Sequence, residues 1–359
     1  MPAIERYLAT LDHEELYVRR GPRSGLFTIV AVHSTVRGPS LGGCRMWAYD
    51  DSRAAVRDAL RLSEGMTYKS AVAGLPLGGG KGVIMLRPGQ PLQPRERRAA
   101  LLDFGETVER LGGTYITAED VGTSTGDMTV IAKETTHVSG LPRRGGGSGD
   151  PSPYTALGVL HAIEATCERV FGSPSLRGRS VAVVGLGHVG LRLAKLLART
   201  GAKLVAADID RAKKAEADRL GARWMTPAKA MTAPVDLLAP CALGGVLDHE
   251  SVPALQTPAI AGAANNQLAD VSVAELLRAR GVLWAPDFVC NAGGIINISV
   301  EFEPGGYDPA RARAKTREIG DTLRRIFDDA DGTTPLAAAL AIAERNLAGA
   351  TRARRASRG

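Results

Sequence analysis

The sequence has little of several features that mark particular classes of protein. Aromatic residues make up 4% of its 359 residues, whereas alanine, glycine and leucine are common. This composition argues against a β-sandwich and suits helices packed on sheets. No apolar run approaches the length of a membrane span, and the initial MPAIERYL lacks the basic and apolar parts of a secretion signal. We therefore expect a cytosolic protein that is long enough for two ordinary domains.

Cysteine is scarce as well. The chain has four cysteines, which are far apart and form no C-x-x-C pair and no metal-ligand spacing: Cys44, Cys167, Cys241 and Cys290. This spacing predicts reduced thiols in a cytoplasmic protein and no metal site.

The formal net charge of +7 is not gathered into one patch of the sequence. Part of it lies in the terminal TRARRASRG, which contains Arg352, Arg354, Arg355 and Arg358. We expect this run to be a frayed, solvated tail. A tail that contacts nucleic acid is the alternative, and it would show as salt-sensitive binding that is lost when residues 351–359 are deleted.

Two lysines flank a glycine triplet in the stretch GMTYKSAVAGLPLGGGKGV, from Gly65 to Val83. Bare backbone at 78–80 can bend freely and let a ligand approach its N–H groups. Burial beside it would lower the pKa of Lys81 and make that amine a proton-transfer group. The alternative is a glycine turn followed by a surface lysine. Helical periodicity over 52–66 would place Lys69 near the end of a helix whose N-cap is Asp51 or Ser52.

Carboxylates and an arginine accompany these lysines. The predicted strand TYITAEDVGT ends at Glu119 and Asp120, a position from which carboxylates can face a ligand crevice. Asp120 could instead be the N-cap of the following helix, which is predicted to begin near 126–128. Arg45, close to Gly42 and Gly43, could hold a carboxylate or a phosphate, or lie on the surface.

A dense run of turn formers at 143–153 predicts a hinge or a domain junction, followed by a helix from Thr155 to Val170 that would present Thr155 to a cleft. We expect an α/β protein with two domains. Residues 1–141 would form a substrate-binding, catalytic and oligomerisation domain. Residues 142–325 would form a Rossmann-type, doubly wound NAD domain, separated from the first by the cleft. The C-terminal helices of 326–359 would pack back towards the N-terminal domain.

The NAD assignment depends on SVAVVGLGHVG, an apolar strand that runs into Gly185-x-Gly187-x-x-Gly190. A helix and a second strand ending at Asp208 complete the dinucleotide fingerprint. The pyrophosphate would lie at the helix N-terminus. Asp208 would bind the adenosine ribose and repel the extra phosphate of NADP, although Arg211 is nearby. The alternative is a doubly wound domain that binds no nucleotide.

Three further strands are predicted at 235–243, 258–266 and 281–288, and each leads to small or polar residues. Among these are Cys241, Asn265 and Asn291, which a parallel sheet would gather along one edge. The asparagine amides could bind a nicotinamide carboxamide or an amino-acid head group. The alternative for each is a turn asparagine.

Taken together, these motifs resemble the amino-acid dehydrogenase family of leucine, valine and phenylalanine dehydrogenases, most closely the leucine dehydrogenases and more distantly glutamate dehydrogenase. The matching stretches keep the family's order between about residues 35 and 300: GPSLGGCRMW, GMTYK, LGGGK, TAEDVGT, GDPSPYTA, GLGHVG, APCALGG, AGAANNQL and APDFVCNAGG. Cys44 stands where family members commonly have threonine, and Gly190 where some leucine dehydrogenases have alanine.

The resemblance implies a reversible, NAD-dependent oxidative deamination and a homo-oligomer. Lys69 would bind the substrate carboxylate, Lys81 would have a lowered pKa and activate a water, and Asp120 would move protons to and from the substrate nitrogen. Gly79 and Asn265 would help to position the amino acid. The cofactor would be bound by Arg45, Thr155, Gly185, Leu186, Gly187, His188, Val189, Gly190, Asp208, Cys241, Ala242, Ala263, Ala264, Asn265 and Asn291.

By the same resemblance, the substrate side chain would lie among Leu41, Gly42, Ala118, Ile295 and Ile298. Such a pocket suits a medium aliphatic side chain, and its lack of a basic residue argues against glutamate. We therefore expect leucine, isoleucine or valine as the substrate. Phenylalanine or tryptophan dehydrogenase is the alternative within enzymes, and a catalytically silent NAD-binding regulator is the alternative outside them. No nucleic-acid or membrane partner is expected.

Overall fold

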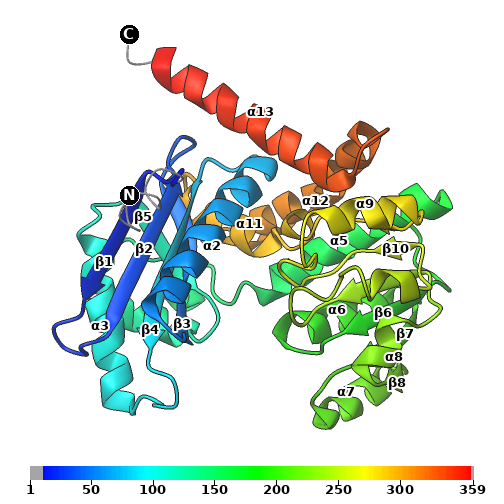
Figure 1. Ribbon diagram of the computed structural model, residues 1–359, viewed down its shortest axis with the longest axis horizontal. Coiled ribbons are helices and arrows are strands. Elements are labelled where there is room, and N and C mark those ends of the chain that lie inside the picture. The colour runs from blue at the N-terminus through cyan, green and yellow to red at the C-terminus, as the bar shows by residue number, and fades with distance from the viewer. Residues whose placement is uncertain (1–10, 357–359) are drawn as a thin grey trace. The chain divides into compact units, whose positions relative to one another are not determined.

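The computed structural model describes residues 11–356, which form two compact units (Figure 1). The first unit comprises residues 11–150 and 344–356, and the second comprises Pro151–Ala343. The first division falls inside the turn-rich segment 143–153. The second differs from the expected boundary at 325/326, because residue 325 lies inside the unbroken helix α12 (Pro309–Asp329).

The first unit is built on a five-stranded sheet in the order β1-β2-β4-β3-β5. Its strands are β1 (Glu15–Arg20), β2 (Phe27–Ser34), β3 (Ser40–Ala48), β4 (Gly78–Leu86) and β5 (Tyr115–Glu119). Strands β1, β2 and β4 pair antiparallel, whereas β4, β3 and β5 run parallel. Because β3 lies between β4 and β5, residues that are far apart in the sequence meet across it.

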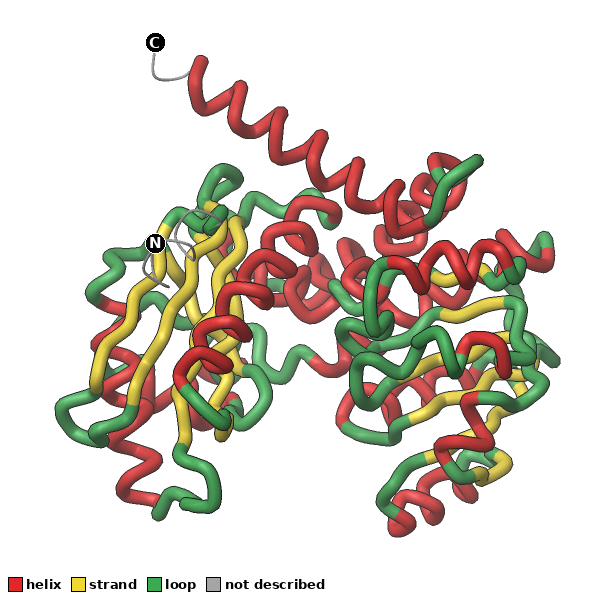
Figure 2. Tube along the Cα trace, in the orientation of Figure 1, coloured by secondary structure: helices red, strands yellow, loops and turns green. Residues whose placement is uncertain are grey.

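Helices cover both faces of this sheet (Figure 2). They are α2 (Ser52–Val72), α3 (Pro94–Glu109) and α4 (Thr125–Ile131). Side chains alternate along β2, so that Ile29 and Ala31 share a buried cluster with α2, whereas Val30 and Val32 share one with α3 and α4. The predicted cap is confirmed, since Asp51 accepts a hydrogen bond from the backbone N–H of Ala54. The helix is longer than the expected 52–66, because the glycine at 65 does not end it.

The glycine triplet is not a loop, which corrects the sequence-based expectation of a freely bending backbone. Gly78, Gly79 and Gly80 are buried residues at the start of β4. A Cβ on Gly79 would lie 2.1 Å from the backbone nitrogen of Thr67 in α2, and a Cβ on Gly80 would lie 2.6 Å from the Tyr115 ring. The glycine at 79 therefore allows α2 to pack directly on β4, and the glycine at 80 accommodates the Tyr115 ring of β5.

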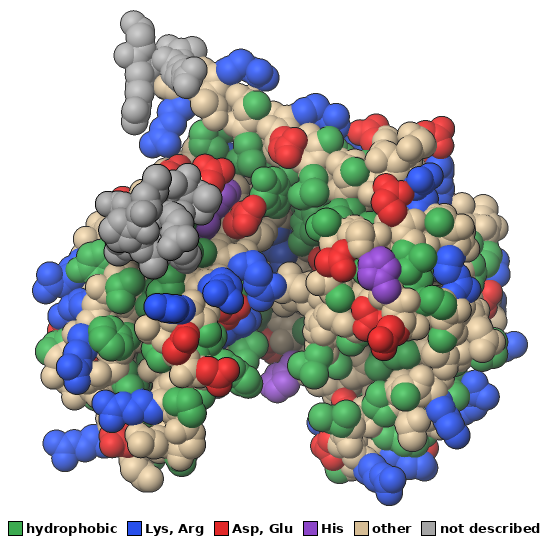
Figure 3. Space-filling model, viewed as in Figure 1, with side chains coloured by type: hydrophobic (Ala, Val, Ile, Leu, Met, Phe, Trp, Pro, Cys, Tyr) green, Lys and Arg blue, Asp and Glu red, His purple; other side chains and the backbone are tan. Residues whose placement is uncertain are grey.

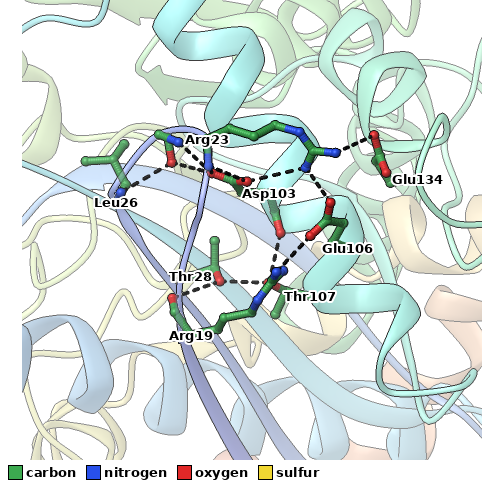
Figure 4. Close-up of polar contacts among 9 residues, drawn as sticks. Arg19, Arg23, Leu26, Thr28, Asp103, Glu106, Thr107 and Glu134 are labelled. Carbon is green, nitrogen blue, oxygen red and sulfur yellow. Dashed lines mark hydrogen bonds and ion pairs between the residues drawn. The ribbon is translucent and has the colours of Figure 1, made fainter.

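The β1–β2 hairpin is tied to α3 by the carboxylate of Asp103, which is fully buried (Figure 4). Its oxygens accept hydrogen bonds from the backbone N–H groups of Arg23 and Ser24 and from the Ser24 hydroxyl. Beside it, Arg19 and Arg23 form ion pairs with Glu106. This network fixes the hairpin and so the edge of the sheet.

The second unit contains a six-stranded, all-parallel sheet in the order β11-β10-β9-β6-β7-β8. Its strands are β6 (Ser180–Val184), β7 (Lys203–Ala207), β8 (Arg223–Met225), β9 (Leu237–Pro240), β10 (Ala259–Ile260) and β11 (Leu283–Trp284). Its helices are α5 (Ser152–Phe171), α6 (His188–Arg199), α7 (Lys214–Arg219), α8 (Pro227–Met231), α9 (Ser272–Ala279), α10 (Asp287–Cys290), α11 (Gly293–Ser299) and α12. The last three strands are shorter than expected, because the chain leaves the sheet in a loop after β9 and β10 and soon enters helix α10 after β11.

The C-terminal segment breaks at 330–334, as the DGTTP pattern predicted, before α13 (Pro335–Ala356). The predicted apolar stripe of α12 is buried: Ile319, Leu323, Ile326 and Phe327. The expectation of a frayed tail is wrong for residues 351–356, because they belong to α13 and Arg354 donates a hydrogen bond to the Thr35 carbonyl. Arg358 and the initial MPAIERYL lie outside the described residues.

Within the described chain, no helix is both long enough and apolar enough to span a membrane. Lysine and arginine side chains are interspersed with aspartate and glutamate over the visible surface of both units (Figure 3). The view therefore shows no single basic face.

Candidate active site

Lys81 and Asp120 meet across β3 in the first unit. Lys81 is on β4 and Asp120 directly follows β5, and the Lys81 Nζ donates a hydrogen bond of 2.7 Å to the Asp120 Oδ2. The Lys81 side chain is almost fully buried, with 6% exposed, whereas 22% of the Asp120 side chain is exposed. The surface-lysine alternative is therefore excluded. So is the N-cap alternative for Asp120, because Ser124 caps α4.

Gly43 makes this contact possible, and sequence reasoning did not assign it a role. It lies on β3, opposite Ala118 of β5. A Cβ on Gly43 would lie 2.6 Å from the Cβ of Asp120, too close for any real side chain. Only glycine therefore lets Asp120 reach over β3 to Lys81. In the sequence, the only sign of this close packing is the pair of glycines at 42–43, and such a pair is equally typical of a turn.

Two cations hold the Asp120 carboxylate as an anion. Burial alone would raise the pKa of Asp120, but Lys81 and Arg45 outweigh burial and lower it to about 2. The Arg45 Nε lies 3.0 Å from the same oxygen, Oδ2, that Lys81 contacts. Arg45 was expected among the cofactor-binding residues. The structure places it on two carboxylates of its own unit, Asp120 and Asp58.

The predicted substrate-binding residues of the first unit lie on strands β3, β4 and β5 and on helix α2. By the alternation of side chains along the strands, Leu41, Lys81, Ala118 and Asp120 lie on the face of the sheet that α2 covers in part. Leu41 pairs with Gly79 on the adjacent strand. Gly42 is buried against β4, where a Cβ would lie 1.7 Å from the Gly80 carbonyl oxygen. Lys69 is partly buried in the last turn of α2.

The glycine fingerprint of the second unit has the geometry of a phosphate-binding turn. Gly185 directly follows β6 with φ of +104°, a conformation that favours glycine. Gly187 is the N-cap of α6, and a Cβ placed on it would meet no atom within 4 Å. A Cβ on Gly190 would lie 1.9 Å from the Gly185 carbonyl oxygen, so the third glycine lets the helix pack on the turn. His188 and Val189 begin the helix, where free N–H groups favour an anion.

Asp208 follows β7 and is bonded to the glycine turn. Its Oδ2 accepts a hydrogen bond of 2.6 Å from the backbone N–H of Leu186, and its Oδ1 accepts one of 2.8 Å from the N–H of Asp210. Each carboxylate oxygen can accept a further hydrogen bond. Asp208 can therefore brace the turn and still accept a hydroxyl donor.

A pair of asparagines lies beyond the neighbouring strands. The Asn291 Nδ2 donates to the Asn265 Oδ1 over 2.8 Å and to the Ala263 carbonyl over 3.1 Å. The Asn291 Oδ1 is buried and has no hydrogen-bond partner in the described chain. An unsatisfied buried acceptor of this kind fits an amide donor, such as the nicotinamide carboxamide. Asn266 alone among the described non-glycine residues has a positive φ, +51°, which marks this turn as locally strained.

The remaining predicted cofactor residues are close to the glycine turn or to α11. A Cβ on Gly185 would lie 2.7 Å from the Cβ of Ala242, and Cys241 contacts the Gly190 position. Burial raises the pKa of the Cys241 thiol to about 12, so this thiol is neutral. Ala264 donates its backbone N–H to the Pro240 carbonyl.

Thr155 lies in the first turn of α5, and its hydroxyl donates to the Pro151 carbonyl. The glycine at 294 in α11 accommodates that hydroxyl, since a Cβ there would lie 2.9 Å from it. Ile295 and Ile298 are buried in the same helix of the second unit. No group of three His, Cys, Asp or Glu side chains suited to a metal ion occurs in residues 11–356.

Comparison with known proteins gives a family match for each of the two units. Residues 17–137 match the dimerisation domain of the Glu/Leu/Phe/Val dehydrogenases, and residues 206–331 match the Glutamate/Leucine/Phenylalanine/Valine dehydrogenase domain. Residues 164–243 also match the NAD-binding domain of the D-isomer specific 2-hydroxyacid dehydrogenases. The two matches on the second unit support its assignment as an NAD(P)-binding domain.

Similar proteins cover nearly the whole chain. It is 43% identical to leucine dehydrogenase of Geobacillus stearothermophilus over 90% of this chain and 86% of the relative. It is 44% identical to valine dehydrogenase of Streptomyces virginiae over 94% of each chain. The crystal structure of L-tryptophan dehydrogenase from Nostoc punctiforme superposes with a TM-score of 0.82 at 37% identity, over 97% of this chain and 99% of that one. The chain therefore belongs to the Glu/Leu/Phe/Val dehydrogenase family and is an NAD(P)-dependent amino-acid dehydrogenase.

Proposed function

We propose that this enzyme catalyses the reversible, NAD-dependent oxidative deamination of a branched-chain L-amino acid to its 2-oxo acid and ammonia. The observation that carries the proposal is the buried Lys81–Asp120 pair, which joins an amine and a carboxylate in the first unit. An amine and a carboxylate in contact are the groups that an imine hydrolysis needs for proton transfer.

The chain's own residues move protons and hold the substrate. NAD, when bound, supplies the hydride acceptor for the substrate Cα. Lys69 binds the substrate carboxylate. The Lys81 amine, once it has released its own proton, takes a proton from the water that attacks the resulting imine, giving a carbinolamine. The Asp120 carboxylate accepts each proton from Lys81 and passes it to the nitrogen. Ammonia leaves when the C–N bond breaks, as the carbinolamine hydroxyl gives up its proton and becomes the carbonyl of the 2-oxo acid.

Residues of the second unit would hold the cofactor. Gly185, Gly187 and the N-terminus of α6 would bind the pyrophosphate, and the unsatisfied Asn291 Oδ1 would accept a hydrogen bond from the nicotinamide carboxamide. Asp208 favours NAD over NADP, because its negative charge is next to the turn where a 2′-phosphate would approach. Arg211, a cation close to Asp208 in the sequence, could oppose this preference.

The side chains that we expect to select the substrate are Leu41 and Ala118 of the first unit and Ile295 and Ile298 of the second. These side chains are apolar and buried, which favours leucine, isoleucine and valine. An apolar pocket discriminates one methylene by only about 1–3 kcal/mol, so all three should be accepted to some degree. The similarity to the tryptophan dehydrogenase of Nostoc punctiforme keeps an aromatic substrate as the second candidate.

A substrate panel tests the proposal. Steady-state rates of NADH formation are measured for leucine, valine, phenylalanine and tryptophan at saturating NAD, and leucine is repeated with NADP. We expect the highest kcat/KM for leucine or valine and a clear preference for NAD. A preference for an aromatic amino acid would overturn the pocket assignment. Binding of NADH without turnover of any amino acid would support a silent regulator instead.

We also propose that the protein is a homo-oligomer, supported by the match of residues 17–137 to a dimerisation domain. Sedimentation velocity at several protein concentrations tests this, and a monomer at all of them would contradict it. A cytosolic location remains part of the same proposal.

A further inference from the structure

The two oxygens of the Asp120 carboxylate have different surroundings. The Oδ2 receives both the Lys81 Nζ, at 2.7 Å, and the Arg45 Nε, at 3.0 Å. The Oδ1 makes no hydrogen bond or ion pair with any described residue. One oxygen is therefore held by two cations from two strands, and the other is left for an additional partner.

Arg45 also forms an ion pair with Asp58 of helix α2. Its Nη1 lies 2.8 Å from the Oδ2 of Asp58, and the Tyr49 hydroxyl donates to that same oxygen over 2.7 Å. Arg61 contacts the other oxygen, Oδ1, at 3.1 Å. The Arg45 and Asp58 side chains are only 20% and 15% exposed, so this is a partly buried bridge and not a surface ion pair.

The planar guanidinium explains why the bridge needs arginine. Its Nε faces Asp120 and its Nη1 faces Asp58, so the two carboxylates are joined through one rigid group. With Lys81 alone on Oδ2, the carboxylate of Asp120 could rotate and exchange its oxygens. A second cation on Oδ2 from a different direction prevents that rotation. A lysine amine cannot reproduce this fork.

We propose that Arg45, oriented by Asp58, is a positioning residue: it keeps the Oδ2 of Asp120 on Lys81 and leaves Oδ1 to exchange protons with the substrate nitrogen. This inference rests on the proposed function, because it assigns a reacting oxygen to Asp120. It gives the bridge from α2 to the sheet a role in orienting the carboxylate, besides any role in packing.

The charges around Asp120 make this role measurable by pH. Lys81 faces it from β4 and Arg45 from β3, and both are cations in contact. Burial raises the pKa values of the Cys44 thiol and the Tyr115 hydroxyl, so both of these neighbours are neutral. Farther away, Arg97 and Asp127 compensate each other at 2.7 Å, as Asp58 does with Arg45 and Arg61. Loss of the Arg45 contact should therefore raise the pKa of Asp120.

The test compares Arg45→Lys and Asp58→Asn with the control Arg61→Gln, which removes a cation from Asp58 without touching Arg45. Each protein is assayed for kcat and KM with leucine, for the pH dependence of kcat, for NADH binding by fluorescence and for its urea unfolding midpoint. We expect Arg45→Lys to lower kcat by roughly 10- to 100-fold, as a misoriented catalytic group does, with a smaller change in KM. The acid limb of its kcat profile should move to higher pH.

Asp58→Asn should lower kcat in the same direction by a smaller factor, and Arg61→Gln should stay within about twofold of the wild type. NADH binding should be unchanged in all three. An Arg45→Lys enzyme with wild-type kcat and an unmoved acid limb would overturn the inference. The inference would also be overturned if the loss of kcat in Arg45→Lys came with a lower unfolding midpoint and with no shift in the acid limb of the kcat profile. A wild-type enzyme that deaminates no amino acid would instead overturn the proposed function itself.

Discussion

Replacing Gly79 with alanine tests how helix α2 lies on the sheet. A Cβ at this position would lie 2.1 Å from the backbone nitrogen of Thr67 and 2.5 Å from the carbonyl oxygen of Ser63. Both are main-chain atoms of α2, so no side-chain rotation relieves the contact. Helix and strand must move apart by about 1 Å to restore ordinary van der Waals separation.

The size of the effect follows from this rigidity. Overpacking a well-packed core typically costs about 1–3 kcal/mol of unfolding free energy, and a clash with backbone belongs at the upper end. Gly65 provides a matched control in the same helix, because a Cβ there meets nothing within 4 Å. Gly65→Ala should stabilise the protein by about 0.5–1 kcal/mol through helix propensity. The two glycine-to-alanine changes should therefore have opposite signs.

Urea unfolding followed by circular dichroism measures both variants at the wild-type protein concentration. We expect the midpoint of Gly65→Ala to lie above that of the wild type and the midpoint of Gly79→Ala to lie below it. Because α2 carries Lys69, a displaced helix should also raise the KM for leucine while NADH binding stays normal. A Gly79→Ala midpoint equal to that of the wild type would refute the packing argument.

Three further predictions concern Asp120, Gly43 and Asp208. The pKa of Asp120 is lowered from 3.8 to about 2, so its carboxylate should contribute roughly 2 kcal/mol to the free energy of unfolding above the unfolded pKa. This contribution is lost as the pH falls towards 2. The urea midpoints at about pH 6 and about pH 3 should therefore differ less in Asp120→Asn than in the wild type. Gly43→Ala should separate Asp120 from Lys81 and lower kcat with little change in NADH affinity; wild-type kcat would contradict the close contact over β3. Asp208→Asn should reduce the ratio of kcat/KM for NAD to that for NADP, and an unchanged ratio would count against its role.

The nucleotide half of the site could be predicted from the sequence because its signals are local. Gly185, Gly187 and Gly190 occupy one turn and the start of one helix, and Asp208 ends the next strand along the chain. Their spacing alone fixes which atoms come together. The structure places them as expected and adds the hydrogen bond from the Leu186 N–H to Asp208.

The amino-acid half could be predicted only in part because it depends on strand order. Lys81 and Asp120 meet because β3 lies between β4 and β5, an order that differs from the order along the chain. The sequence predicts a bending loop at the glycines of β4 and cannot show their packing, since glycine serves both in turns and where backbones pack closely. The roles of Gly43 and Asp58 could not be predicted either, because each depends on a contact with a residue more than ten positions away in the sequence.

The central claim is that the buried amine of Lys81 drives the deamination. Its most direct test compares Lys81→Ala with Lys133→Ala, an exposed lysine of the same unit. The measurement is the initial rate of leucine-dependent NADH formation, with NADH binding followed in parallel by fluorescence. We expect Lys81→Ala to lose at least about 100-fold in kcat while NADH affinity stays near the wild-type value, and Lys133→Ala to keep both. Turnover by Lys81→Ala at the wild-type rate would contradict the account.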